Sequence, residues 1–270
     1  MADSRQHIET MIRNWKDVQV DRSTFRMGRP NYRTNEGQFA MVYAYCAHVH
    51  ATADAYLVVL DVGPALVATP LARVCYEMAI TAQWIAQTPD GYRALNNEEI
   101  RSRVALVKAF RESASEVFQE GATAVAHADA SERLESDSDA SARNFEQLCL
   151  DLAPGGKDAY AIYRAMSMES HPNVLIADQW IDPPDDEGGR HKLRIIPKDG
   201  SAIETWSYMV AASLVWSGRA LDYFDRGHRR RSFLRTMARE VGAAETLQLS
   251  DIYRRRIADA NRARRAAPRR

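Results

Sequence analysis

The sequence predicts an all-α protein: an up-and-down helical bundle with extra helices at both ends and one small inserted β-hairpin. Apolar residues recur at helical spacing through most of the 270 residues. Breaks containing Gly and Pro, such as Gly63–Pro64 and Pro154–Gly155–Gly156, separate these helical segments. Only one stretch, near residues 177–197, is typical of paired strands.

The N-terminal part of the chain is predicted to contain two helices and a linker. An apolar stripe predicts a short amphipathic helix over residues 3–20, and turn-forming residues predict a connecting loop over 21–35. A continuous apolar seam then predicts a long bundle helix over 36–62. We therefore divide the chain into an N-terminal extension, residues 1–35, and a bundle core that starts at residue 36 and runs to 226.

The next predicted helix, residues 65–87, is apolar or small on nearly every side, so it should be buried almost all round. Arg73 and Glu77 lie inside it, four residues apart, where they can form an ion pair. Burying charges is costly unless they are paired and hydrogen-bonded. The pair is either a structural ion pair or part of a ligand or catalytic site.

The later elements follow from the same patterns. Asn97–Glu98–Glu99 is a capping sequence for a long helix that should reach about Asp129, and the polar stretch 130–142 predicts a loop. Two extended runs around a tip rich in Pro, Gly and acidic residues predict the hairpin near 177–197. Further helices are predicted over residues 144–152, 200–224, 230–241 and 244–265.

One predicted helix carries the principal candidate site. Its polar stripe consists of Tyr160, Arg164, Ser167 and His171. Pro172 should end the helix directly after His171, where the unsatisfied carbonyls and the negative end of the helix dipole favour imidazolium. Arg164 can bind phosphate or carboxylate, and His171 can transfer a proton. The alternative is that Arg164 pairs with a neighbouring helix and that His171 only caps its own helix.

His50 lies on the apolar seam of the 36–62 helix, which is the usual position of a hydrogen-bonded core histidine. Together with Asp54 and Glu77 it could instead serve a metal-dependent bundle enzyme, but the Glu-x-x-His repeats of di-iron bundles are absent from the sequence. We therefore predict neither a metal nor another cofactor. The cysteines lack CxxC spacing and predict a reduced, cytoplasmic protein: Cys46, Cys75 and Cys149.

The formal charge is zero but unevenly distributed. From residue 226 to 270 there are fourteen arginines against four acidic residues. A basic end, residues 227–270, on an acidic body favours binding of a polyanion such as RNA, although a solvated tail is the alternative. The candidate phosphate contacts are Arg229, Arg230, Arg231, Arg254, Arg255 and Arg256.

No membrane span or secretion signal is predicted. The first residues are polar and contain no apolar core of a signal peptide, and charges interrupt the longest apolar runs. The sequence also contains no GxGxxG, P-loop or GxSxG motif.

Two segments of the sequence form a recognisable signature. The first reads Leu-x-Arg-x-x-x-Glu, here Leu71, Arg73 and Glu77, followed by Trp84–Ile85. The second reads Tyr-x-x-x-Ser-x-x-x-His-Pro, here Tyr163, Ser167, His171 and Pro172. With these segments the chain resembles the DUF5677 family, which has no settled activity, over residues 36 to about 225.

In a wider sense the chain is similar to the HEPN superfamily of helical bundles. Many members are metal-independent ribonucleases, often of toxin or defence type, with an arginine followed at short spacing by a histidine. Arg164 and His171 enclose six residues, at the edge of that spacing, and Ala165 departs from the polar residue common in active members. The resemblance implies His171 as general acid or base, Arg164 as the group that stabilises charge on the phosphate, and a homodimer.

A second hypothesis assigns no catalysis to the chain. It is a helical module that binds a small anionic ligand or a partner protein in a polar pocket of Arg73, Glu77, Arg164 and His171. The residues predicted to support the site or to bind the ligand are Arg73, Glu77, Tyr160, Ser167 and His50.

Overall fold

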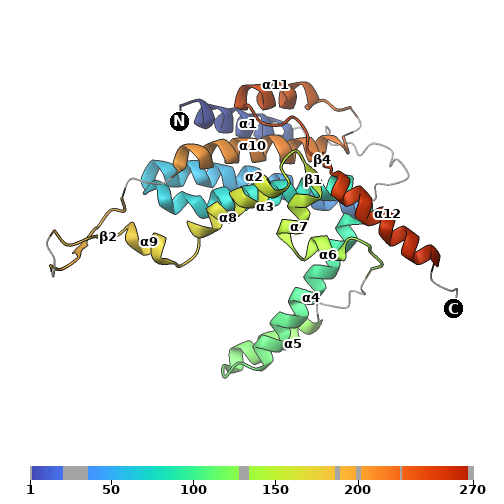
Figure 1. The fold of residues 1–270 in the computed structure, drawn as a ribbon, viewed down its shortest axis with the longest axis horizontal. Helices are drawn as coiled ribbons and strands as arrows, with labels where there is room; N and C mark the ends of the chain where they lie inside the picture. Colours follow the sequence, from blue (N-terminus) through green and yellow to red (C-terminus); the bar gives the residue numbers. More distant parts are fainter. Residues whose placement is uncertain are drawn as a thin grey trace.

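The computed structural model describes residues 2–20, 36–127, 134–185, 189–198, 202–225 and 227–266, so the predicted linker 21–35 lies outside it. These residues form twelve helices and four strands of two residues each. The protein is therefore an all-α helical bundle, as the sequence predicts (Figure 1).

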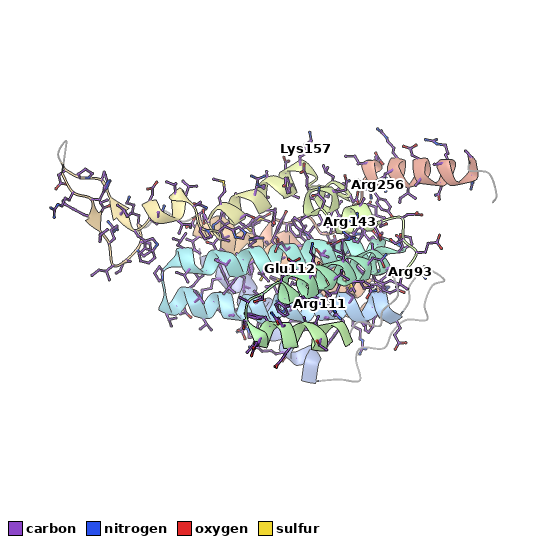
Figure 2. The ribbon with its side chains drawn as sticks, turned by 90° about the horizontal axis from the view of Figure 1, so that it is seen from below. Arg93, Arg111, Glu112, Arg143, Lys157 and Arg256 are labelled. Atoms are coloured by element: carbon purple, nitrogen blue, oxygen red, sulfur yellow. The ribbon has the colours of Figure 1, made fainter. Side chains whose placement is uncertain are left out.

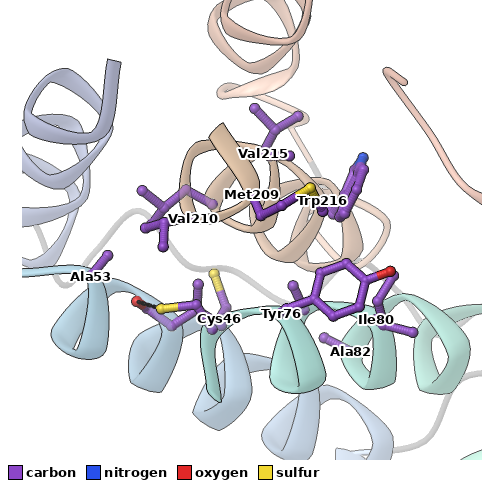
Figure 3. Close-up of a cluster of buried hydrophobic side chains, with 14 of the residues drawn as sticks. Cys46, Ala53, Tyr76, Ile80, Ala82, Met209, Val210, Val215 and Trp216 are labelled. Carbon is purple, nitrogen blue, oxygen red and sulfur yellow. Dashed lines mark hydrogen bonds between the residues drawn. The ribbon is translucent and has the colours of Figure 1, made fainter. Parts of the chain in front are cut away.

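Three long helices form the centre of the bundle: α2 (Glu36–Val62), α3 (Ala65–Gln87) and α10 (Ile203–Asp222). Their apolar side chains meet in the core, where Cys46 of α2, Tyr76 of α3 and Val210 of α10 lie close to one another (Figure 3). Helices α1 (Ala2–Val20) and α11 (Arg231–Val241) pack against α10, and α8 (Lys157–Met168) packs against α3.

The turn between α2 and α3 lies where the sequence places it. The Gly63 amide bonds to the Val59 carbonyl at 2.9 Å, and Pro64 takes an extended conformation that cannot continue the helix. The predicted bounds of both helices, 36–62 and 65–87, are therefore confirmed. In α10 every residue from Met209 to Asp222 is buried.

The prediction of one helix from Asn97 to about Asp129 is wrong. The structure has α4 (Gly91–Arg111) and α5 (Glu116–His127), joined by a turn. Ser113 competes with the helical backbone there, because its hydroxyl accepts the Ser115 amide at 3.2 Å. The two helices form a hairpin that projects from the bundle (Figure 1).

The last predicted helix begins later than expected. Residues 248–249 form β4 (Gln248–Leu249), which pairs antiparallel with β1 (Leu152–Ala153), and α12 (Asp251–Ala266) starts only after it. The Gln87 amide donates to the Leu247 carbonyl at 2.6 Å and helps to hold this segment extended. A ladder of two residues has no periodicity that a sequence could reveal.

The remaining elements are short. The predicted hairpin is confirmed, since β2 and β3 pair antiparallel with Ile181 opposite Leu193. The bounds are α6 (Asp139–Ala142), α7 (Phe145–Leu150), α9 (Val174–Asp178), β2 (Ile181–Asp182) and β3 (Lys192–Leu193).

Among the described helices, α3 is long and apolar enough to cross a membrane by length and composition. In the structure it contacts α2, α8 and α10 within the bundle. The absence of a membrane span stays a prediction.

Asp151 joins three parts of the fold. Its fully buried carboxylate accepts two hydrogen bonds from the guanidinium of Arg256 on α12, both at 2.7 Å, and one from the Trp84 indole on α3 at 3.0 Å. A bidentate pair of this kind fixes both distance and orientation. The carboxylate therefore holds α12 against the bundle.

We predict that Asp151→Asn lowers the free energy of unfolding by about 3 kcal/mol, because the Arg256 guanidinium loses its countercharge while remaining partly buried. Asp259→Asn is the matched control, since Asp259 pairs with Arg262 on the exposed face of the same helix. It should cost less than about 0.5 kcal/mol. Equal losses in urea denaturation would contradict the role given to Asp151.

Candidate functional site

Helix α8 does not present the predicted polar stripe as one surface. The helix ends at Met168, before His171, so the prediction that it continues to Pro172 is wrong. The Ser170 hydroxyl bonds back to the Met166 carbonyl at 2.7 Å, and Asn173 caps the following helix, α9, by accepting the Ile176 amide. His171 therefore lies in a bend after α8.

Arg164 and His171 have different surroundings. The Arg164 side chain is exposed on α8, and neither an ion pair nor a hydrogen bond joins it to another described residue. His171 is also exposed, but its Nε2 atom lies 2.5 Å from Nη1 of Arg73 on α3. The guanidinium that contacts His171 is therefore that of Arg73 and not that of Arg164.

Arg73 is the centre of a polar cluster between α3 and α8. Its Nη2 donates to Glu77 Oε1 and to the Tyr163 hydroxyl, both at 3.1 Å. Its Cζ atom lies 5.1 Å from the centroid of the Tyr163 ring, within cation–π range. The predicted Arg73–Glu77 ion pair is confirmed, with both side chains partly rather than fully buried.

The Arg73–His171 contact assigns the acceptor atom. Arginine has donors only, so His171 Nε2 accepts this hydrogen bond. In a neutral imidazole with this contact, the ring proton lies on Nδ1. That the helix dipole favours imidazolium at His171 stays a prediction.

A second carboxylate lies beside the cluster. Glu169, the residue after α8, accepts the Trp206 indole proton at 2.7 Å and the Thr69 hydroxyl at 3.3 Å. Thr69 precedes Arg73 by one helical turn on α3. The cluster therefore continues along one face of α3 toward α10.

Tyr160 and Ser167 both contact Tyr163, and their role in ligand binding stays a prediction. The Tyr160 ring stacks on the Tyr163 ring at 5.9 Å between centroids, and the Ser167 hydroxyl donates to the Tyr163 carbonyl at 2.8 Å. Tyr163, Glu169 and Thr69 were missed as site residues. Tyr163 lies within the family motif, which was the one sequence feature that could have identified it.

His50 is a core residue of α2 and is not part of this cluster. Its Nδ1 bonds to the Cys46 carbonyl at 2.8 Å, and its ring stacks on Trp15 at 4.4 Å. Burial, together with the charge of Arg230, lowers the pKa of His50 to about 3.

The residues of the metal hypothesis are directed to different partners. Asp54 pairs with Lys16 at 2.9 Å, Glu77 pairs with Arg73, and His50 bonds to its own helix. Within the described ranges, no group of three or more His, Cys, Asp or Glu side chains is placed to hold a metal ion.

The arginines near the start of the basic end differ in exposure. Arg229 is exposed. The Arg230 side chain bonds to Asn14 at 3.0 Å and lies over the Trp15 ring, and its pKa is lowered by burial. Arg231 pairs at 3.1 Å with Asp222, which is buried on α10.

The three consecutive arginines of α12 also differ in exposure. Arg256 is bound to Asp151, whereas Arg254 and Arg255 are exposed. Arg230, Arg231 and Arg256 are therefore engaged inside the protein, and Arg254 pairs with Asp251 at 2.8 Å on the surface. Nucleic-acid binding stays a prediction for all six arginines.

The site thus belongs to an all-helical bundle with a cluster of Arg, Glu, Tyr and His between two of its helices. A family model matches residues 39–189, which include all of α3 and α8 and the bend that carries His171. The chain belongs to this family, the family of unknown function DUF5677. No curated protein matches the chain, and no solved structure does either.

The depressed pKa of His50 predicts acid sensitivity. The unfolded imidazole takes up a proton below about pH 6.5, whereas the folded one stays neutral until about pH 3. Stability is therefore complete above pH 6.5 and falls as the pH is lowered, by up to about 1.4 kcal/mol for each pH unit.

His50→Asn should lower stability at pH 7 and remove this component of the acid dependence. The measurement is urea denaturation from pH 7 to pH 4, with His191→Asn on the exposed hairpin as the control. If wild type and His50→Asn show parallel pH profiles, His50 does not cause the acid sensitivity.

Proposed function

We propose that the protein binds a phosphate-bearing ligand at the Arg73–His171 pair. One observation carries this proposal: two side chains that can each carry a positive charge are held 2.5 Å apart at an exposed position. In their contact His171 Nε2 accepts the hydrogen bond. An anion between them would accept hydrogen bonds from both groups and would favour imidazolium.

The surroundings of Arg73 support phosphate in particular. Glu77 and Tyr163 hold the Nη2 edge of the guanidinium, so its orientation is set before any ligand arrives. The Nη1 edge faces the exposed His171. A planar guanidinium matches two phosphate oxygens, and an anchored one loses little freedom on binding. Arg164, exposed on α8, is a second cation available to a ligand with more than one phosphate.

We predict that the wild-type protein binds adenosine 5′-monophosphate and inorganic phosphate in calorimetric titrations. Arg73→Gln and His171→Gln should each weaken binding by at least about tenfold, because each removes a charge-assisted hydrogen bond.

Arg111→Gln, which removes an exposed arginine on α4, is the matched control and should bind as wild type does. His171 is exposed, so its substitution tests the site without depending on the fold. Wild-type binding that is absent, or that both site variants retain, would overturn the proposal.

Metal-independent RNA cleavage is a second candidate for the same site. It is favoured by the presence of a proton-transferring group, His171, directly beside the Arg73 guanidinium. In this reaction the RNA 2′-hydroxyl attacks the adjacent phosphorus and His171 accepts its proton, while the guanidinium stabilises the charge on the phosphate. The P–O5′ bond breaks, the 5′-oxygen leaves with a proton from solvent water, and the products are a 2′,3′-cyclic phosphate and a 5′-hydroxyl. The resemblance to HEPN ribonucleases gives the guanidinium role to Arg164, and the contacts favour Arg73 for it.

The cleavage candidate predicts that mixed RNA is degraded in the presence of EDTA and that His171→Ala abolishes the degradation. Arg73→Gln should lower the rate by at least about a hundredfold, as for a lost charge-stabilising group, whereas Arg164→Ala should have a smaller effect. Activity that needs a divalent metal, or that survives in His171→Ala, would exclude this candidate.

A further inference from the structure

The α4–α5 hairpin stands away from the bundle and has almost no core of its own. In α4 only Gly91, Ala94 and Asn97 are buried, all within its first two turns. We call the rest of α4, residues 98–111, together with α5, the arm (Figures 1 and 2). Among the described side chains of the arm only Ala122 is buried.

The two helices of the arm contact each other along a narrow seam. The Phe110 and Phe118 rings lie 5.3 Å apart, and Gly121 lies against Phe110. Other apolar side chains of the two helices are exposed to solvent: Val104 of α4 is 60 % exposed and Val117 of α5 is 75 % exposed. The apolar surface of the arm is therefore wider than the seam that α4 and α5 bury between them.

Two short helices alone are poorly stable in water. The arm helices are roughly 18–21 Å long, and most helical stability in proteins comes from packing of an apolar face. Two antiparallel helices with uncovered apolar flanks form one half of a four-helix bundle. Packing against another helical hairpin would cover the exposed valines.

The charges of the arm indicate which hairpin fits. Residues 100–111 of α4 carry Arg101, Arg103, Lys108 and Arg111 and no acidic residue, whereas α5 carries Glu116 and Glu120 and no Lys or Arg. Arg101 and Arg103 are paired with Glu98 and Glu99, and Lys108 lies 3.9 Å from Glu112 at the exposed turn. Arg111, beside that turn, forms no ion pair with another described residue and is the cation that most needs a partner. Figure 2 shows Arg111 beside the turn.

The structure assigns a second copy of this chain as the partner of the arm. We propose that two arms pack into a four-helix bundle, with the basic α4 of each copy against the acidic α5 of the other. A two-fold axis repeats this contact, so the same charge complementarity between α4 and α5 occurs in both halves of the interface. The dimer leaves the Arg73–His171 cluster outside the interface and is independent of the proposed function.

The first test is the oligomeric state of the full chain by sedimentation velocity over a range of concentrations. Wild type should dimerise, and the double variant Val104→Glu with Val117→Glu should raise the Kd by at least about tenfold. Ile195→Glu is the matched control, because Ile195 is 95 % exposed on the hairpin and lies outside the arm. It should dimerise as wild type does.

The second test exchanges charges. One protein carries Lys108→Glu and Arg111→Glu, which makes its arm acidic, and the other carries Glu116→Lys and Glu120→Lys, which makes its arm basic. Each alone should be largely monomeric, because equal charges would meet, and their mixture should form a heterodimer. A monomeric wild type, or charge variants that self-associate as well as wild type, would overturn the proposal. Loss of the dimer in Ile195→Glu with retention in the valine double variant would do the same.

Discussion

The partly buried guanidinium of Arg73 is the constraint on which the site depends. It lies on α3, the apolar helix at the centre of the bundle, where a charge without partners would be costly. Glu77 supplies the countercharge from the next turn, and Tyr163 and His171 supply hydrogen-bond partners from α8 and the bend after it. One partly buried cation thus binds the face of α8 that carries Tyr163.

Elements whose limits are set locally could be predicted from the sequence. The bounds of α2 and α3 follow from an apolar seam and from Gly63–Pro64, and the Arg73–Glu77 pair follows from spacing within one helix. The break after Arg111 could not be predicted in this way. A serine that hydrogen-bonds to the backbone destabilises a helix only slightly, so such a residue ends a helix only where tertiary packing does not support its continuation. The strand β4 depends wholly on tertiary contacts and has no local pattern.

The candidate site was predicted in part, and the error has a physical cause. A helical projection from Tyr160 to His171 assumes that the helix continues to Pro172, whereas it ends at Met168. The rotation of about 100° per residue on which the projection rests applies only within the helix. His171 is therefore displaced from the Arg164 stripe and meets Arg73, a residue that was predicted only as support.

The arginines of the C-terminal part have different roles, although they look alike in the sequence. The run suggests a uniform basic surface, yet Arg231 and Arg256 each neutralise a buried carboxylate, on α10 and after α7 respectively. An excess of arginine in one part of a sequence can thus partly reflect ion pairs inside the protein. The exposed remainder of the run and the charges of the α4–α5 arm form separate surfaces.

The central claim is that Arg73 and His171 are direct partners that separate around an anion. Nitrogen-15 NMR of the His171 ring tests it most directly, because it distinguishes protonated from unprotonated Nδ1 and Nε2. The account predicts an unprotonated Nε2 in the free protein at neutral pH, and protonation of both nitrogens when phosphate is added. A ring protonated on Nε2 in the free protein, or one that phosphate leaves unchanged, would contradict it.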